Sequence, residues 1–88
     1  MRRDEQPEAS WSIDCRRMPA PYPLLGARAA IALMSEGEIL SLLLTDRDCV
    51  LDAPAWCRMT GNRFVGAEER RGTHRLLIQK GIDPCRSR

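Results

Sequence analysis

Long apolar runs are absent from this sequence of 88 residues. The most apolar stretch, Ile39–Leu44, is far shorter than the roughly 20 residues that a membrane-spanning helix needs. Residues 1–10 are polar and lack the apolar core of a secretory signal peptide. These two absences predict a soluble, cytoplasmic protein without a membrane partner.

Aromatic residues and an excess of one charge are also lacking. The chain has two tryptophans, one tyrosine and one phenylalanine, and its 14 basic residues nearly balance its 12 acidic ones. Nucleic-acid-binding surfaces typically combine a strongly basic face with aromatic side chains, so the composition argues against a direct nucleic-acid partner. Every basic residue except Lys80 is arginine. Either bidentate recognition of carboxylates and phosphates or a GC-rich genome would produce this bias.

Metal-binding and disulfide patterns are missing too. Cys15, Cys49, Cys57 and Cys85 form no C-x-x-C pair, and His74 is the single histidine. This spacing matches neither a zinc site nor a dense disulfide framework. We expect no metal and no cofactor, reduced thiols that are mostly small buried side chains, and a solvent-facing His74.

The sequence does contain an alternation of strand-like and helix-like segments. Trp11 and Ile13 alternate with polar residues, which predicts a short strand, and the nearly continuous apolar segment 38–46 predicts an interior strand. The expected order is strand, helix, strand, helix, strand, strand, over residues 10–14, 23–34, 38–46, 46–62, 63–69 and 73–80, the last two joined by the turn 70–72. This βαβαββ order predicts an α/β two-layer sandwich, with a four-stranded mixed sheet and two helices on one face. We expect one domain over residues 10–81 and flexible segments at 1–9 and 82–88.

The two predicted helices carry start, stop and packing signals. Asp46 or Asp48 can cap the second helix, Gly61 suits a left-handed stop, and Pro54 predicts a kink or a restarted first turn. Apolar residues at helical spacing predict the buried faces. These are Leu24, Leu25, Ala27, Ile31, Ala32 and Met34 in the first helix, and Val50, Leu51, Trp56, Cys57 and Met59 or Thr60 in the second.

Three prolines at alternate positions lead into the first helix. Proline disfavours a helical conformation in the residue before it, so Pro19, Pro21 and Pro23 are expected to hold their preceding residues, Tyr22 included, extended. Proline at a helix start sacrifices no hydrogen bond, because the first N–H groups have no intrahelical partner. The rigid lead therefore presents Ala20 at the positive end of the helix dipole. A cysteine there would be a reactive thiolate, whereas alanine is a poor cap and supplies no thiol.

The segment IDCRRMPAPYP resembles the N-terminal motif of the TusA/SirA-like sulfur carriers, which is roughly L-D-x-R-G-L-x-C-P-x-P followed by the first helix. Ile13, Asp14, Arg16, Pro21 and Pro23 match this motif. Further along, GEILSLLLTD is similar to the family's second strand, DAPAWCRMTGN to its D-I-P-x-F-C helix, and HRLLIQKG to its last strand. The resemblance covers most of the chain and implies the same two-layer fold.

The resemblance also implies a sulfur-relay function. In that chemistry a carrier thiolate attacks the persulfide of a donor and retains the outer sulfur. The implied partner is a cysteine desulfurase or another sulfur-transfer protein. The implied destinations of the sulfur are tRNA thiolation, molybdenum cofactor synthesis and sulfur oxidation.

Two positions depart from the family motif. The sulfur-carrying cysteine falls on Ala20, and the glycine of the motif falls on Arg17. Without a thiol at residue 20 no persulfide can form there. Three interpretations follow: a sulfur-relay protein that lacks the usual acceptor thiol, a catalytically silent binding or regulatory module, and an engineered Cys-to-Ala form of an active carrier. Arg17 favours natural divergence, because an engineered removal of the thiol gives no reason to change that position.

The remaining candidates surround Ala20 or carry other thiols. Cys15 is a possible substitute thiol at the end of the first strand, with a packed side chain as the alternative. Arg16, Arg17 and Arg28 are expected to form a basic rim around residue 20 that docks an acidic partner, with a solvated surface as the alternative. The predicted partner-binding residues are Asp14, Arg16, Arg17, Pro21, Pro23 and Arg28.

Three further features carry weaker signals. Cys57 is expected in the core, and Cys85 is expected in an exposed tail that does not preorganise it. The segment PAPYP resembles a polyproline II ligand, but its position at a helix start argues against that role. The protein is expected to be a monomer.

Overall fold

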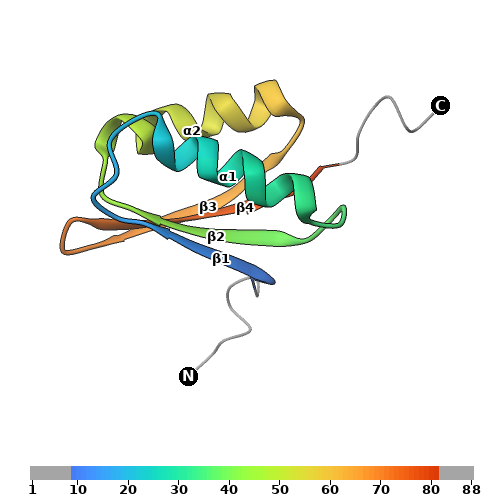
Figure 1. The fold of residues 1–88 in the computed structure, drawn as a ribbon, viewed down its shortest axis with the longest axis horizontal. Helices are drawn as coiled ribbons and strands as arrows, with labels where there is room; N and C mark the ends of the chain where they lie inside the picture. The colour runs from blue at the N-terminus through green and yellow to red at the C-terminus, as the bar shows by residue number, and fades with distance from the viewer. Residues whose placement is uncertain (1–8, 82–88) are drawn as a thin grey trace.

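Six elements follow one another in the predicted order (Figure 1). They are β1 (Trp11–Cys15), α1 (Tyr22–Leu33), β2 (Ile39–Leu44), α2 (Arg47–Thr60), β3 (Arg63–Arg70) and β4 (Thr73–Gln79). The computed structural model describes residues 9–81. Apart from Ala9, the segments predicted to be flexible, and Cys85 with them, lie outside these residues. Within residues 9–81, neither helix has the length and apolar character needed to cross a membrane.

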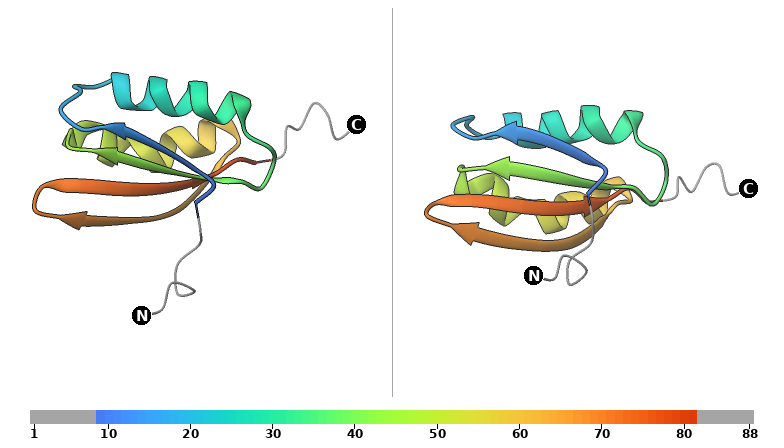
Figure 2. Two further views of the ribbon diagram at one scale, coloured as in Figure 1. Left: turned by 60° about the horizontal axis from the view of Figure 1, so that its bottom comes forward. Right: turned by 90° about the horizontal axis from the view of Figure 1, so that it is seen from below.

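The four strands form one mixed sheet in the order β1-β2-β4-β3. β1 pairs with β2 in parallel, from Trp11 opposite Leu40 to Cys15 opposite Leu44, and the other two pairs are antiparallel. Both helices pack on one face of this sheet, and within residues 9–81 no helix covers the other face (Figures 1 and 2). The predicted fold class is therefore confirmed.

The core lies between the sheet and the two helices. Alternation along the central strands β2 and β4 turns their fully buried leucine and isoleucine side chains toward the helices. The helices meet them with small residues such as Ala27 and Ala53, both 0% exposed. Cys57 is also buried there, as expected. The buried side chains of the two central strands that form this layer are Leu40, Leu42, Leu44, Leu76 and Ile78.

The buried faces of both helices are narrower than the apolar pattern predicts. Successive helical residues are about 100° apart, and each helix has only one side against the sheet. In α2 the buried residues repeat every fourth position, which leaves a single narrow stripe. Five residues predicted on the buried faces are exposed, and these predictions are wrong: Leu25, Ala32, Leu51, Met59 and Thr60.

The ends of α2 follow the local signals, but its middle does not. The Asp46 carboxylate accepts a hydrogen bond from the Cys49 N–H at 3.1 Å, so Asp46 is the cap. Gly61 ends the helix with φ +78°, as predicted. The helix runs without interruption through Pro54, so it does not restart there.

β3 and β4 form the predicted hairpin. Its two turn residues, Arg71 and Gly72, have φ values of +52° and +84°, the positive values that a type I′ hairpin turn requires at both positions. Near the other end of the hairpin the register shifts between Phe64 and Gly66, which forms a β-bulge in β3.

Candidate functional site

The residues between β1 and α1 lie against the residues between β2 and α2. Because β1 and β2 are parallel, both connections leave the same edge of the sheet, where α/β proteins commonly bind their ligands. Two hydrogen bonds join the connections: the Arg17 N–H donates to Thr45 Oγ1 at 2.9 Å, and the Ala20 N–H donates to Asp46 Oδ2 at 3.1 Å. The segment that carries residue 20 is thus fixed to the start of α2.

Asp46 connects the starts of the two helices with a single carboxylate. Its Oδ1 accepts from Cys49 in α2, and its Oδ2 accepts from Ala20 ahead of α1. The first contact follows from the capping position in the sequence. The second joins residues 26 positions apart, and no local pattern indicated it.

The start of α1 differs in one respect from the prediction. Tyr22 was expected to be extended because it precedes Pro23, but it is the first residue of α1. Its N–H donates to the Pro19 carbonyl at 3.0 Å, and this turn carries the chain directly into the helix. This turn therefore overrides the extended conformation that Pro23 favours in Tyr22.

Residue 20 lies at a helix start without a side-chain cap. Pro21 occupies the N-cap position of α1, and no side-chain hydrogen bond caps the helix there. The first turn of α1 also contains no acidic residue. The helix dipole thus favours a negative charge close to this end. Ala20 is exposed and presents only a methyl group.

The thiols in the described part of the chain are buried. Cys15, Cys49 and Cys57 are 5%, 1% and 1% exposed and form no disulfide. Burial raises the pKa of all three, that of Cys57 to about 11, and the charge of Asp14 adds to the effect at Cys15. These thiols are protonated at neutral pH. The Cys15 sulfur lies 3.5 Å from the point where a Cβ at Gly26 would stand, so it packs against the side of α1.

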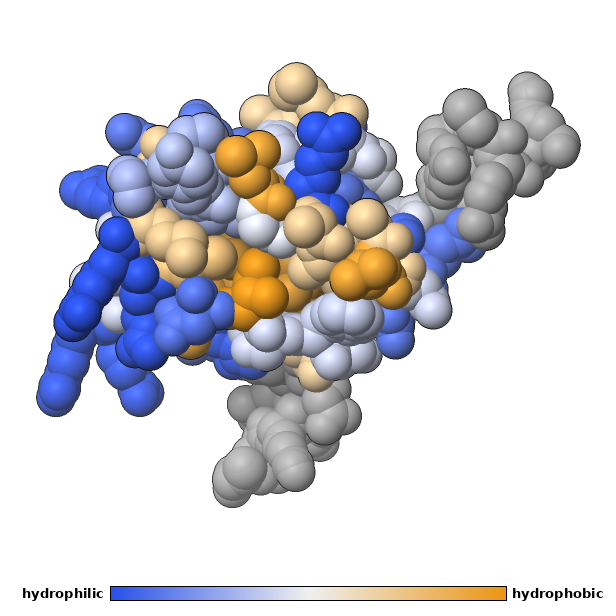
Figure 3. All heavy atoms as spheres, in the orientation of Figure 1, coloured by the Kyte–Doolittle hydropathy of each residue, from blue (hydrophilic) through white to orange (hydrophobic). Residues whose placement is uncertain are grey.

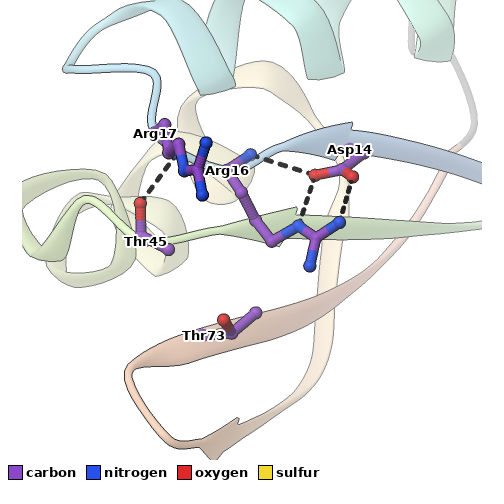
Figure 4. Close-up of a pocket in the computed structure, with 5 residues that line it drawn as sticks. All are labelled: Asp14, Arg16, Arg17, Thr45 and Thr73. Carbon is purple, nitrogen blue, oxygen red and sulfur yellow. Dashed lines mark hydrogen bonds and ion pairs between the residues drawn. The ribbon is translucent and has the colours of Figure 1, made fainter.

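Three of the predicted partner-binding residues line one pocket. Asp14, Arg16 and Arg17 surround it with Thr45 and Thr73, and its volume is about 550 Å³ (Figure 4). Neither threonine had a signal in the sequence. Thr45 directly follows β2, and only the pairing of β4 with β2 brings Thr73 to the same place. The other predicted partner-binding residues, Pro21, Pro23 and Arg28, do not line this pocket.

Asp14 and Arg16 form a close ion pair within the pocket. Arg16 Nε donates to Asp14 Oδ1 at 2.9 Å, and Arg16 Nη2 lies 2.6 Å from Oδ2. The side-chain and backbone hydrogen bonds from Arg16, together with its charge, hold the pKa of the Asp14 carboxyl at about 2. Asp14 therefore stays ionised at neutral pH, and Arg16 balances its charge.

Arg17 occupies the backbone position of the motif's glycine with φ +70°. Side chains other than glycine rarely adopt this left-handed conformation, which explains physically why a glycine suits this position. Its guanidinium has no ion-pair or hydrogen-bond partner within residues 9–81.

The surface around residue 20 includes large exposed apolar side chains. Met18 is 44% exposed, Tyr22 57% and Leu25 51%, and all three lie on or just before α1. Figure 3 shows apolar side chains gathered over the helix-bearing side, with strongly hydrophilic side chains projecting from one edge. Among residues 9–81, no three histidine, cysteine or acidic side chains are grouped so that they could hold a metal ion.

Comparison with known proteins agrees with the fold and the N-terminal motif. Residues 12–80 match the family model described as sulfurtransferase TusA. The "Putative sulfur carrier protein" of Neisseria meningitidis serogroup A is 36% identical over 70 residues, which is 80% of this chain and 95% of that protein. The sulfur carrier protein TusA of Allochromatium vinosum is 32% identical over 68 residues, 77% of this chain and 90% of that protein.

A solved structure shares the architecture. The crystal structure of a SirA-like protein from Desulfitobacterium hafniense matches with a TM-score of 0.72 at 20% identity, covering 82% of this chain and 99% of that one. The fold is thus that of a SirA-like α/β protein. With the family model matched over residues 12–80, the chain belongs to the TusA family of sulfur carriers.

Proposed function

We propose that this protein works in a cytoplasmic sulfur relay by binding a sulfur-transfer protein, and that it does not accept sulfur at residue 20. The observation that supports this most directly is the methyl group of Ala20 at the uncapped start of α1. The backbone around it is held in place by Asp46, yet the group that would attack a persulfide is missing. We further propose that the protein acts as a monomer.

None of the three thiols within residues 9–81 supports a substitute carrier. A carrier thiol must reach the persulfide of its partner as a thiolate, and Cys15 is buried with a raised pKa. Cys49 and Cys57 are buried more deeply still. We propose packing, and not sulfur transfer, as the role of all three.

Docking requires no thiol. The exposed side chains of Met18, Tyr22 and Leu25 offer apolar contact beside residue 20, and Arg28 on α1 is an exposed cation without an ion-pair partner among residues 9–81. Apolar anchors with basic residues at the rim suit a partner that has an acidic rim of its own. By binding through this surface without accepting sulfur, the protein would occupy the docking site of its partner and regulate a competent carrier by competition.

The first test measures sulfur transfer directly. The protein is incubated with a cysteine desulfurase and cysteine, and its intact mass is then determined. We expect no gain of about 32 Da, the mass of one sulfur atom, for the wild-type chain, and a stoichiometric gain for Ala20→Cys. A stoichiometric gain on the wild-type chain contradicts the proposal, and mapping the sulfur to Cys15 would identify that residue as the carrier.

The second test measures binding. We expect wild-type protein and Ala20→Cys to bind the desulfurase with Kd values within about twofold, because a methyl-for-thiol exchange removes little contact area. Excess wild-type protein should slow sulfur loading of Ala20→Cys. If the wild-type chain neither binds nor competes while Ala20→Cys is loaded normally, the docking function is refuted.

A further inference from the structure

The pocket lined by Asp14, Arg16, Arg17, Thr45 and Thr73 has no part in the function proposed above. It lies where β1 and β2 end and β4 begins, and Asp14 alternates with Cys15, which packs against α1. The Asp14 carboxylate therefore points to the face of the sheet opposite α1. The pocket and the exposed apolar side chains beside residue 20 are separate features of the same edge.

The side-chain oxygens of Asp14 and Thr45 in this pocket already accept hydrogen bonds. Both carboxylate oxygens of Asp14 accept hydrogen bonds from Arg16, and Oδ1 also accepts from the Arg16 N–H at 3.1 Å. Thr45 Oγ1 accepts from the Arg17 N–H. With the charge of Asp14 balanced by Arg16, the pocket keeps one uncompensated positive charge, that of Arg17.

The donors, by contrast, remain available. The Arg17 guanidinium and the Thr73 hydroxyl have no side-chain partner within the described residues. The Thr45 hydroxyl accepts a hydrogen bond through its oxygen, so its own hydrogen is free to be donated. The third guanidinium nitrogen of Arg16 points away from Asp14, toward the strand that carries Thr73 (Figure 4).

We propose that this pocket binds a tetrahedral oxyanion of the phosphate, sulfate or thiosulfate class. Such an anion accepts hydrogen bonds through several oxygens and carries the negative charge that balances Arg17. The donors come from three segments of the chain around the pocket, so several oxygens of a tetrahedral group can accept from them, whereas a planar carboxylate offers only two. The site is independent of residue 20, so the proposed docking function and this binding can fail separately.

The test is a titration followed by amide NMR at constant ionic strength. Phosphate, sulfate and thiosulfate are added separately to wild-type protein, with chloride replaced to keep screening equal, and acetate serves as the planar control. We expect saturable shifts in the millimolar range at residues 16, 17, 45 and 73, with acetate at least about fivefold weaker. Tightest binding of phosphate would identify a phosphate-bearing ligand, and tightest binding of thiosulfate a sulfur oxyanion.

Three variants test whether the named donors carry the binding. Arg17→Gln removes the free guanidinium charge, and Arg58→Gln removes the same charge in the last turn of α2, outside the pocket. We expect Kd to rise about tenfold for Arg17→Gln, about threefold for Thr73→Val, and less than twofold for Arg58→Gln. Unsaturable shifts, acetate binding as tight as phosphate, or equal effects of the two arginine variants would each overturn the proposal.

Discussion

Replacing Arg17 with glycine should stabilise this protein, although it removes a whole side chain. Arg17 has φ +70°, a conformation that costs a residue with a Cβ about 1–2 kcal/mol. Glycine avoids this cost, but its more flexible unfolded chain offsets the gain by about 0.4–1 kcal/mol. The guanidinium has no partner within residues 9–81, so its removal costs little.

The expected net gain is about 0.5–1 kcal/mol in the free energy of unfolding, which is roughly 2–8 °C in Tm for a domain of this size. Arg17→Ala isolates the backbone effect, because it removes the same guanidinium but keeps a Cβ. The hydrogen bond from the residue 17 N–H to Thr45 remains in both variants. Urea unfolding of wild type and both variants, analysed with a common m value, measures the differences.

The same pair of substitutions at Arg70 provides the control. Arg70 lies in β3 and has no positive φ, so glycine there should be less stable than alanine. If the Arg17→Gly variant is no more stable than the Arg17→Ala variant, or if positions 17 and 70 behave alike, the left-handed backbone does not explain the glycine of the family motif.

Three further predictions concern charge. The thiol of Ala20→Cys should have a pKa below the usual value of roughly 8.5, because α1 begins there, and Asp46→Asn should lower it further by removing a nearby negative charge. The pH dependence of the alkylation rate at residue 20 measures both pKa values, and a pKa of about 8.5 or above in Ala20→Cys would contradict the first expectation. Arg28→Glu should weaken binding to a cysteine desulfurase severalfold at low salt and less at high salt, which calorimetry at two salt levels measures. If wild type and Arg28→Glu bind equally tightly at both salt levels, the basic rim is only a solvated surface. Ionised Asp14 should stabilise the fold above its usual pKa of 3.8, and this contribution should disappear as pH falls through about 2. The difference in unfolding midpoint between wild type and Asp14→Asn should therefore be larger at pH 7 than at pH 2, and an unchanged difference would be the contrary result.

Much of the fold was predictable because its signals are local. The alternation at Trp11 and Ile13, the cap at Asp46 and the stop at Gly61 each act within a few residues, and each appears in the structure. Exposed apolar residues were not predictable in this way. Leu51 has the same hydropathy whether it faces the sheet or the solvent, and only the packing of α2 decides between them.

The candidate site was predictable only in part for a different reason. The motif placed Asp14, Arg16 and Arg17 together because they are neighbours in sequence. Thr73 joins them through the antiparallel pairing of β4 with β2, and the hydrogen bond from Ala20 to Asp46 depends on the two connections lying side by side. Contacts of this kind depend on the tertiary fold, which a pattern within one segment does not specify.

The bulge between Phe64 and Gly66 has a consequence for how copies of this protein behave at high concentration. β3 is an edge strand, and a regular edge offers unpaired backbone groups on which strands of other molecules can add. The bulge interrupts that regular row, and the charged side chains of Glu68, Glu69 and Arg70 occupy the rest of the strand. This edge therefore resists edge-to-edge pairing with other molecules, whereas β1, the other edge strand of the sheet in residues 9–81, is regular throughout its five residues.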